Sequence, residues 1–399
     1  MTKDTVNKPV SFRIVVGLYE HNLLCLSVNI TEKSEPLFTP IFHFQAHTLS
    51  IKSIDIAKRY LVTGSNDEHI RIYDLKRRKE LGTLLSHQGT VTTLKFSKET
   101  VDSDDAKSGK WFLSGSEDGK IIIWRTKDWE MFGTLKGHQG RVNDLDIHPS
   151  GRVAISVSTD KTIRLWNLMT AKKAAILKIK GRDHLGQSGE MVRWTGDGKH
   201  FLVGLLNQIF VYTLGAEAEL ASKIKLKTTL MCMEVLQIEG EEYLVTGHSN
   251  GALEFHLVST LIKSDDEQKP EPAFTLTGHS NRIKGISLHQ SKVDTNDVPY
   301  LVSVSSDGRI VVWNLSSKVR DQVAVYDSGE RLNCVAVCGE AIEDTEALKR
   351  RYEEVETDKA AGLESEYESD GEELVKAAVT NTRKKGKKNQ KSKVTVTLE

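Results

Sequence analysis

Cysteine is scarce in this chain of 399 residues, with four at Cys25, Cys232, Cys334 and Cys338. They form no CxxC pair and have no histidines at metal-ligand spacing, which argues against a disulfide framework and a zinc site. Net charge is absent as well, because 55 Lys and Arg balance 55 Asp and Glu. The chain is therefore not a uniformly basic protein that coats nucleic acid. We expect reduced, buried thiols, no metal and no cofactor.

Long apolar runs are also missing. Runs such as residues 201–206 are far too short to cross a bilayer. Residues 1–11 are polar and lack the apolar segment of a signal peptide. These absences predict a soluble intracellular protein with no membrane partner and a flexible N-terminus over residues 1–11.

What the sequence does contain is an internal repeat. A small residue and His precede one strand, a second strand ends in Asp at a tight turn, and a third ends in Trp or Tyr. Each strong copy also has Ser or Thr four residues before the Asp, and the aromatic residue six residues after it. The four sets are His47, Thr63, Asp67 and Tyr73; His87, Ser114, Asp118 and Trp124; His138, Ser156, Asp160 and Trp166; and His279, Ser303, Asp307 and Trp313.

Spacing predicts seven repeats in all. His138 and His279 are 141 residues apart, which leaves room for two weaker copies between them. These copies carry Asn207 and Asn250 where the strong copies have Asp, so we expect less rigid or specialised units. Near the ends, residues 12–19, 22–28 and 41–45 resemble three strands and residues 332–337 a fourth. Joined, they predict an all-β, seven-bladed β-propeller over residues 12–338, closed by N- and C-terminal strands that leave no sheet edge open.

The repeated Ser, His and Asp residues resemble a catalytic triad, but we interpret them as structural. An enzyme needs one such site in one pocket, whereas four copies tied to strand-ending aromatics satisfy buried polar groups and join strands. The segment 115–120 lacks the spacing of a phosphate-binding loop, and there is no GxSxG or HExxH sequence. We therefore expect no catalytic residue and no small-molecule substrate.

These anchors identify a WD40 propeller, and several long blocks narrow the resemblance. They are FRIVVGLYEHNLLCLSV from Phe12, IFHFQAH from Ile41, SNDEHIRIYDLKRRKELGTLLSHQG from Ser65, RVNDLDIHPSGRVAISVSTDKTIRLWNLMT from Arg141, GHSNRIK from Gly278 and ERLNC from Glu330. They resemble the WD-repeat family whose fungal members are called maintenance-of-killer proteins and whose animal members are called p21-activated-kinase-interacting proteins. Segments 182–190 and 264–272 depart from the family pattern, and the resemblance assigns them no role.

The resemblance implies a nucleolar scaffold in assembly of the large (60S) ribosomal subunit. Its partners would then be proteins of the pre-60S particle and pre-rRNA. The animal family name implies an alternative, a regulator that binds and restrains a p21-activated kinase. A third alternative, a substrate receptor of a ubiquitin ligase, needs a Trp-Asp-x-Arg sequence, and the chain offers only imperfect matches such as Tyr73-Asp74-Leu75-Lys76.

A candidate partner surface follows from the repeat. Positions three and five residues after each repeat His, with their counterparts in the last strand, should lie on the narrow face of a propeller. Those chosen as partner-binding residues are Lys52, Arg141, Asn143, Arg282, Lys284 and Arg331. Such a face suits an acidic peptide or RNA phosphate, because guanidinium pairs bidentately with either. The alternative is ordinary solvated surface charge.

After residue 338 the pattern changes. Spaced apolar residues predict an amphipathic helix over residues 339–360, and residues 361–399 are expected to be disordered, first acidic and then basic. Ser365 and Ser369 stand beside acidic residues, which is a weak signal for phosphorylation. The basic run predicts a nuclear or nucleolar address or an RNA contact; its residues are Arg383, Lys384, Lys385, Lys387, Lys388, Lys391 and Lys393.

Overall fold

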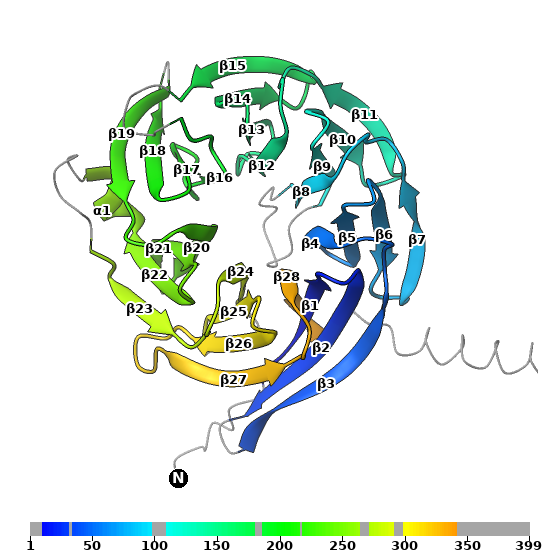
Figure 1. Ribbon diagram of the computed structural model, residues 1–399, viewed down its shortest axis with the longest axis vertical. Coiled ribbons are helices and arrows are strands. Elements are labelled where there is room, and N and C mark those ends of the chain that lie inside the picture. Colours follow the sequence, from blue (N-terminus) through cyan, green and yellow to red (C-terminus); the bar gives the residue numbers. More distant parts are fainter. Residues whose placement is uncertain are drawn as a thin grey trace, which may run out of the picture. The chain divides into compact units, whose positions relative to one another are not determined.

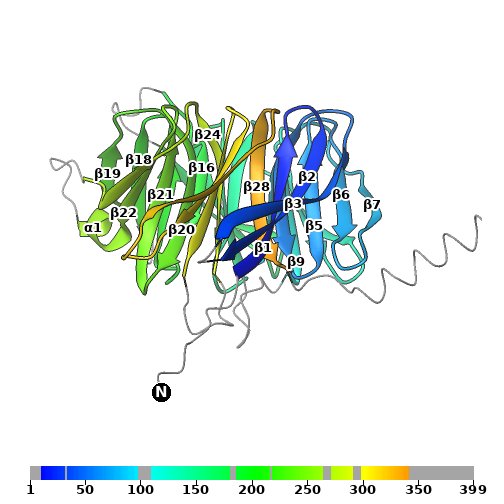
Figure 2. The same ribbon diagram turned by 90° about the horizontal axis from the view of Figure 1, so that it is seen from below.

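The structure, a computed structural model, describes residues 10–31, 34–97, 109–179, 186–215, 218–263, 271–290 and 298–340. These residues form seven four-stranded antiparallel sheets, which stand as blades around a central channel (Figure 1). Figure 2 shows the ring from the side. The predicted seven-bladed β-propeller is confirmed.

Four blades contain the strongly repeated sets. From the channel outward they are β4 (Ile51–Ala57), β5 (Tyr60–Ser65), β6 (Ile70–Asp74) and β7 (Lys79–Leu84); β8 (Val91–Phe96), β9 (Trp111–Ser116), β10 (Ile121–Arg125) and β11 (Glu130–Leu135); β12 (Val142–Ile147), β13 (Val153–Ser158), β14 (Thr162–Asn167) and β15 (Lys172–Lys178); and β24 (Ile283–His289), β25 (Tyr300–Ser305), β26 (Arg309–Asn314) and β27 (Asp321–Asp327).

Three blades depart from that pattern. They are β16 (Met191–Trp194), β17 (His200–Gly204), β18 (Gln208–Leu214) and β19 (Ala218–Lys225); β20 (Leu230–Ile238), β21 (Glu241–His248), β22 (Ala252–Leu257) and β23 (Phe274–Thr277); and the closing blade, β28 (Leu332–Gly339), β1 (Val10–Leu18), β2 (Asn22–Thr31) and β3 (Ser34–Gln45). One short helix, α1 (Val258–Lys263), follows β22.

The hydrophobic core lies between the blades. Seven clusters of buried aliphatic and aromatic side chains each draw on two neighbouring sheets. Because a blade packs on both faces, its middle strands are buried along nearly their whole length and largely apolar, as in β13, whereas outer strands such as β15 are mostly exposed. This explains why the sequence shows runs of Val, Ile and Leu in place of strict alternation.

Strands from both ends of the described chain close the ring. Figure 1 shows β28, in orange, beside β1, in dark blue, and the two pair from Phe12 with Gly339 to Leu18 with Leu332. Arg13, a buried residue of β1, donates to Glu340 Oε1 at 3.0 Å, and Ser27 of β2 donates to the other oxygen at 2.9 Å. A carboxylate just beyond β28 therefore holds the two partner strands of the closing blade.

The observed bounds of β1, β3 and β28 differ from those predicted from the sequence. Val10 and Ser11, placed in the flexible N-terminus of residues 1–11, pair with β2, so β1 begins two residues early. The third strand runs over Ser34–Gln45 where residues 41–45 were expected, because β3 continues along a longer β2. The end of the ring, expected at 338, is extended by Gly339.

Several predictions fall outside the described residues. They concern most of residues 1–11, the helix of residues 339–360 beyond residue 340, the acidic and basic tail of residues 361–399, and most of segments 182–190 and 264–272. Helix α1 was not expected. Val258 and Leu261 of α1 are buried, and Ser222 of β19 donates to the Leu261 carbonyl at 2.7 Å. The helix therefore links two neighbouring blades.

Candidate functional site

The four repeated sets form buried hydrogen-bond chains inside single blades. In the blade of β12 to β15, His138 Nδ1 lies 2.9 Å from Asp160 and its Nε2 lies 2.8 Å from Ser156 Oγ. The indole nitrogen of Trp166 donates to the same Ser156 oxygen at 2.8 Å. The set therefore links the loop before the blade to β13, to β14 and to the turn between these strands.

The same geometry recurs in the other strong blades. Ser114 and Ser303 each lie 2.8 Å from Nε2 of His87 and His279, and accept from Trp124 and Trp313 at 2.9 and 2.8 Å. In the sets of His47, His87 and His279, the distance from His Nδ1 to the Asp carboxylate is 3.0 to 3.4 Å. In the first set Tyr73 takes the aromatic position, and His47 reaches Thr63 at 2.7 Å.

Burial decides that these sets are structural. Ser156 is fully buried, as are its counterparts Ser114, Ser303 and Thr63, so no substrate can reach the hydroxyl oxygen. Burial lowers the pKa of His138 despite the adjacent carboxylate. Burial alone would raise the pKa of Asp160, but hydrogen bonds from Thr162 and His138 hold it at about 2. A neutral imidazole between a carboxylate and a hydroxyl fixes the turn and satisfies buried polar groups.

The blade of β20 to β23 satisfies the same position differently. Thr246 of β21 occupies the hydroxyl position, and it lies 2.9 Å from Nε2 of His248, two residues later. The other ring nitrogen of His248 lies 2.8 Å from Thr228. Asn250 takes over only the turn, accepting from the Ala252 backbone at 3.1 Å. The blade of β20 to β23, which has Asn250 in place of the repeat Asp, is therefore a specialised unit.

A ring of β-bulges surrounds one end of the channel. Six of the seven innermost strands shift register near their first residue. A bulge adds an unpaired residue and redirects its side chain. The six bulged residues line a cavity of about 390 Å³ in the channel, and they are Lys52, Thr92, Asn143, Met231, Lys284 and Asn333. We call the end of the channel at these residues the channel mouth.

Three of the bulged side chains connect neighbouring blades. Thr92 donates to the Val142 carbonyl at 2.6 Å, Asn143 to the Gly189 carbonyl at 2.8 Å, and Asn333 to the Ile51 carbonyl at 2.9 Å. Asn143, predicted to bind a partner, thus already has a structural contact. Lys52 and Lys284 also line the cavity, and within the described part of the chain neither forms a hydrogen bond or an ion pair.

The structure brings four of the predicted partner-binding residues together at the mouth. Lys52, Arg282, Lys284 and Arg331 belong to three consecutive blades. Burial lowers the pKa of Lys284 below its ordinary value, and the positive charges of Arg282, Lys52 and Arg331 lower it further. Arg141 is exposed and stands three blades from Arg282, outside this group. We call the four grouped residues the cationic cluster.

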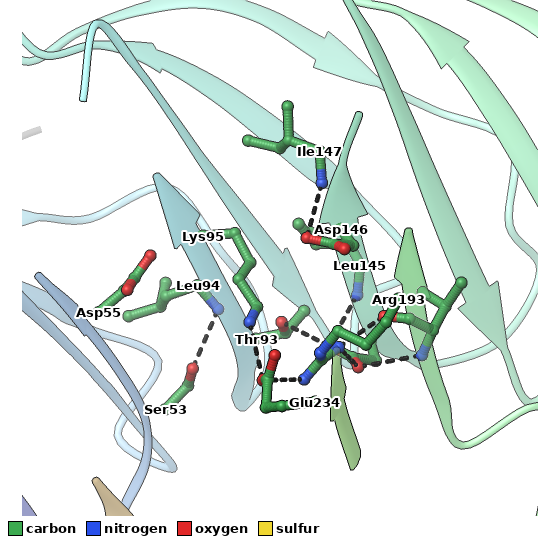
Figure 3. Close-up of polar contacts among 12 residues, drawn as sticks. Ser53, Asp55, Thr93, Leu94, Lys95, Leu145, Asp146, Ile147, Arg193 and Glu234 are labelled. Atoms are coloured by element: carbon green, nitrogen blue, oxygen red, sulfur yellow. Dashed lines mark hydrogen bonds and ion pairs between the residues drawn. The ribbon is translucent and has the colours of Figure 1, made fainter. Parts of the chain in front are cut away.

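A second charged group lies within the channel and was missed in the sequence. Figure 3 shows Arg193 of β16 beside Glu234 of β20, at 2.8 Å, and Lys95 of β8 reaching the same glutamate at 3.3 Å. Arg193 also pairs with Asp144 of β12. Burial would lower the pKa of Arg193, but Asp144 and Glu234 raise it well above its usual range. The channel network, Lys95, Asp144, Arg193 and Glu234, therefore joins four blades.

Aspartates of the innermost strands also join neighbouring blades, because they accept hydrogen bonds from backbone N–H groups of the next blade. Asp55 of β4 accepts from the Phe96 N–H at 2.7 Å, and Asp146 of β12 accepts from the Trp194 N–H at 2.9 Å. The signal available in the sequence was charge within otherwise apolar strands, as in the Asp144 to Asp146 stretch. A charged side chain buried in a strand needs a partner. The Asp residues of this stretch could therefore have predicted contacts between blades.

Across the described ranges, His, Cys, Asp and Glu side chains nowhere gather in a group of three able to hold a metal ion. Within that same portion of the chain, no helix has the length and apolar character of a membrane span. Burial raises the pKa of the channel-lining thiols of Cys232 and Cys334 to about 12, so they stay protonated.

Comparison with known proteins agrees with this architecture. The model of the WD domain, G-beta repeat, matches residues 38–74, 78–125, 129–167 and 270–314. Each matched repeat includes the outer strand of one blade and three strands of the next, so repeats interlock around the ring. The four matches contain the four strong sets, and WD40 propellers are typically non-enzymatic scaffolds for protein interactions.

Relatives match over most of the chain. Protein MAK11 of Saccharomyces cerevisiae is 48% identical over 97% of this chain and 98% of its own length. The p21-activated protein kinase-interacting protein 1-like of Gallus gallus is 33% identical over 84% of this chain and 85% of its own. Shk1 kinase-binding protein 15 of Schizosaccharomyces pombe is 25% identical over 90% and 96%. The chain therefore belongs to the WD40-repeat family that includes protein MAK11 and the p21-activated protein kinase-interacting proteins.

Proposed function

We propose that this protein is a non-enzymatic scaffold in nucleolar assembly of the large ribosomal subunit, where it binds assembly factors or ribosomal proteins and pre-rRNA. The observation that carries the proposal is 48% identity to protein MAK11 over nearly the whole chain. The family resemblance implies large-subunit assembly for members of this kind. A closed ring with inaccessible hydroxyls suits presentation of a surface better than turnover of a substrate.

The partner surface in this proposal includes the cationic cluster. Arg282 and Arg331 are exposed, and Lys52 and Lys284 line the cavity between them. Exposed charges contribute little to folding, so a double substitution of Arg282 and Lys284 by Glu should lower recovery of partners without lowering the melting temperature. Normal recovery of partners by that variant would remove these residues from the surface.

Sedimentation of the tagged full chain tests the main function. We expect the protein to migrate with large pre-ribosomal particles in a sucrose gradient and to co-purify with precursors of the large subunit. Depletion of the protein should reduce mature large subunits relative to small ones. Migration only at the top of the gradient, with normal subunit ratios, would rule out the proposal.

A kinase regulator is the second candidate, supported by the names of relatives. The chicken relative is named for interaction with a p21-activated kinase, and the fission-yeast relative for binding Shk1 kinase. In that case the purified chain should lower the activity of a p21-activated kinase in vitro. Co-purification with a kinase and absence from pre-ribosomal fractions would favour this function over ribosome assembly.

The basic tail is proposed to supply nucleolar localisation and RNA affinity. Seven of the eleven residues 383–393 are Lys or Arg, while the whole chain is neutral. Deleting residues 382–399 should reduce nucleolar concentration and flatten the salt dependence of RNA binding, because fewer counterions are released. Imaging and an RNA titration at two salt concentrations separate an import signal from an RNA contact. Unchanged results in both assays would leave only a solubilising role.

A further inference from the structure

We propose that the channel mouth is a docking site for an extended acidic peptide, with one carboxylate entering the cavity toward Lys52 and Lys284 and others held at the rim by Arg282 and Arg331. The inference rests on the proposed scaffold function and specifies its partner as a protein segment rich in Asp and Glu. Neither the family match nor the names of the relatives assign a ligand to this end of the channel.

Backbone geometry places two cations inside the mouth and two at its rim. The bulges at Lys52 and Lys284 aim both side chains into the cavity, while Arg282 and Arg331 stay exposed outside it. A peptide in β conformation places alternate side chains on one side about 7 Å apart. Such a segment crossing the rim can insert one carboxylate and leave its neighbours for the guanidinium groups, which bind carboxylates bidentately.

The cationic cluster has no internal counterion. Among the residues that the structure describes, none of its four members forms an ion pair with a carboxylate, and Lys284 is held close to three like charges. Glu330, the acid next to Arg331 in sequence, lies 3.5 Å from His43 and accepts from Asn22 at 3.4 Å instead. An incoming carboxylate would relieve repulsion that the folded chain cannot relieve by itself.

The channel network limits how far an acidic chain can enter. Lys95 and Arg193 meet Glu234 across the axis, and Asp144, Asp55 and Asp146 add carboxylates nearby. This deeper part carries more acidic than basic groups, so it repels a second carboxylate. The cavity of about 390 Å³ is lined by this network as well as by Lys52 and Lys284, so a chain that entered farther would meet these carboxylates.

The same features favour a peptide over RNA. Single-stranded nucleic acid binds where exposed aromatic rings stack on bases along a basic groove. An aromatic residue beside this rim, Tyr19, is half exposed, but one face of its ring already contacts the Arg331 guanidinium, 5.3 Å from the ring centre. Glu190 lines the cavity opposite the cations, and it would repel a continuous phosphate backbone while leaving room for a peptide held on one side.

Fluorescence anisotropy with a fluorescein-labelled decamer of glutamate tests the proposal on the full-length protein. Charge-assisted hydrogen bonds contribute enough that Lys284→Gln should weaken binding about tenfold. The matched control is Arg141→Gln, which removes one charge from an exposed site three blades away. It should change affinity less than about twofold. The basic tail is present in every variant, so its contribution cancels in the comparison.

Chemical protection gives a readout at single residues. Acetic anhydride should acetylate Lys52 and Lys284 more slowly when the glutamate decamer is bound, as quantified by mass spectrometry. Exposed Lys173, on outer strand β15, is the control and should react equally with and without peptide. Glu190→Gln should tighten peptide binding, because it removes the opposing carboxylate from the cavity.

Three results would overturn the proposal: equal peptide affinity in the Lys284 and Arg141 variants, no protection of Lys284, or tighter binding of a uridine decamer that is lost in the Lys284 variant. Sedimentation distinguishes failure of the docking proposal from failure of the proposed scaffold function. If the wild-type protein sediments with pre-ribosomal particles but shows none of the peptide effects, docking fails and the scaffold stands. If the peptide effects appear without co-sedimentation, docking stands and the scaffold function fails.

Discussion

Polar contacts within a blade and polar contacts between blades hold this ring together in different ways. Within a blade, all four sets place a His between an Asp carboxylate and a buried hydroxyl, with the His Nε2 2.7 to 2.8 Å from that hydroxyl. Between blades, several contacts use charge and differ in their partners, such as Arg193 with Glu234 and Asp55 with the Phe96 backbone. Repeated sets build the blade, whereas contacts between blades combine repeated bridges, such as those of Thr92 and Asn143, with single ion pairs such as that of Arg193 and Glu234.

The difference has an energetic reason. A neutral hydrogen bond contributes about 0.5–1.5 kcal/mol net, and losing one of several copies leaves the others intact. A buried ion that loses its partner costs several kcal/mol, because its desolvation is no longer compensated. Buried ion pairs between blades should therefore be more sensitive to substitution than the repeated sets.

The largest effect on stability is expected from removal of the closing strand, β28. Ending the chain at residue 330 deletes β28, exposes the edge of β1 and leaves Arg13 without Glu340. We expect loss of cooperative unfolding and aggregation, since open strand edges pair between molecules. Calorimetry and size-exclusion chromatography measure both. A chain ending at residue 343 is the control and should stay folded, and a soluble, cooperative form of the shorter chain would contradict ring closure.

Arg193→Ala should have the next largest effect. It leaves Asp144 and Glu234 without their main counterion, which should cost about 3–5 kcal/mol of unfolding free energy in guanidinium titration. Arg152→Ala, at an exposed position of the neighbouring blade, should cost less than about 0.5 kcal/mol. Equal effects of the two substitutions would show that the channel network does not bear on stability.

A substitution in a repeated set within one blade should lower the free energy of unfolding by less than Arg193→Ala does. His138→Ala leaves Asp160 and Ser156 each short of a hydrogen bond, for a loss of about 1–3 kcal/mol in the same titration. Gln139→Ala, next to it and exposed, serves as the control and should be near neutral. An unchanged free energy of unfolding for the His138 variant would count against the structural assignment.

Acid should weaken the repeated sets. Burial lowers the pKa of His47, His87, His138 and His279, so the folded state resists protonation that the unfolded chain accepts below about 6.5. Stability should be complete above that pH and fall as the pH drops below it. Thermal melts between pH 7.5 and 5 measure the loss. His138→Gln should flatten the profile, and a level wild-type profile would disprove the linkage.

The smallest effect is expected from Lys284→Gln. Because the pKa of Lys284 is lowered in the fold, its charge opposes folding at neutral pH, and that cost disappears as the pH rises past the folded-state pKa. The variant should melt at the same temperature as the wild type or slightly higher at pH 7, with the gap closing near pH 10. A clearly lower melting temperature at pH 7 would mean that Lys284 is a structural residue.

Much of the fold was predictable from the sequence because its determinants repeat. Fixed spacing between Ser or Thr, Asp and the strand-ending aromatic residue identified four sets, and the interval from His138 to His279 set the number of blades. The extent of β3 was missed because hairpin length depends on pairing with β2, and α1 was missed because its apolar residues pack on a neighbouring blade. The role of His248 was missed because it bonds from outside the repeat spacing.

The amino-acid sequence by itself determined the repeated chemistry of the four strong blades and the presence of basic residues at four of the eight positions three and five residues after the repeat His. Only the tertiary structure decided which of those residues meet. Arg141 and Arg282 hold equivalent repeat positions, but closure of the ring places Arg282 beside Arg331 and leaves Arg141 three blades away. Lys95 and Glu234, 139 residues apart, meet because their strands face one channel. Such contacts obey no period, since they arise from curvature that seven packed sheets produce together.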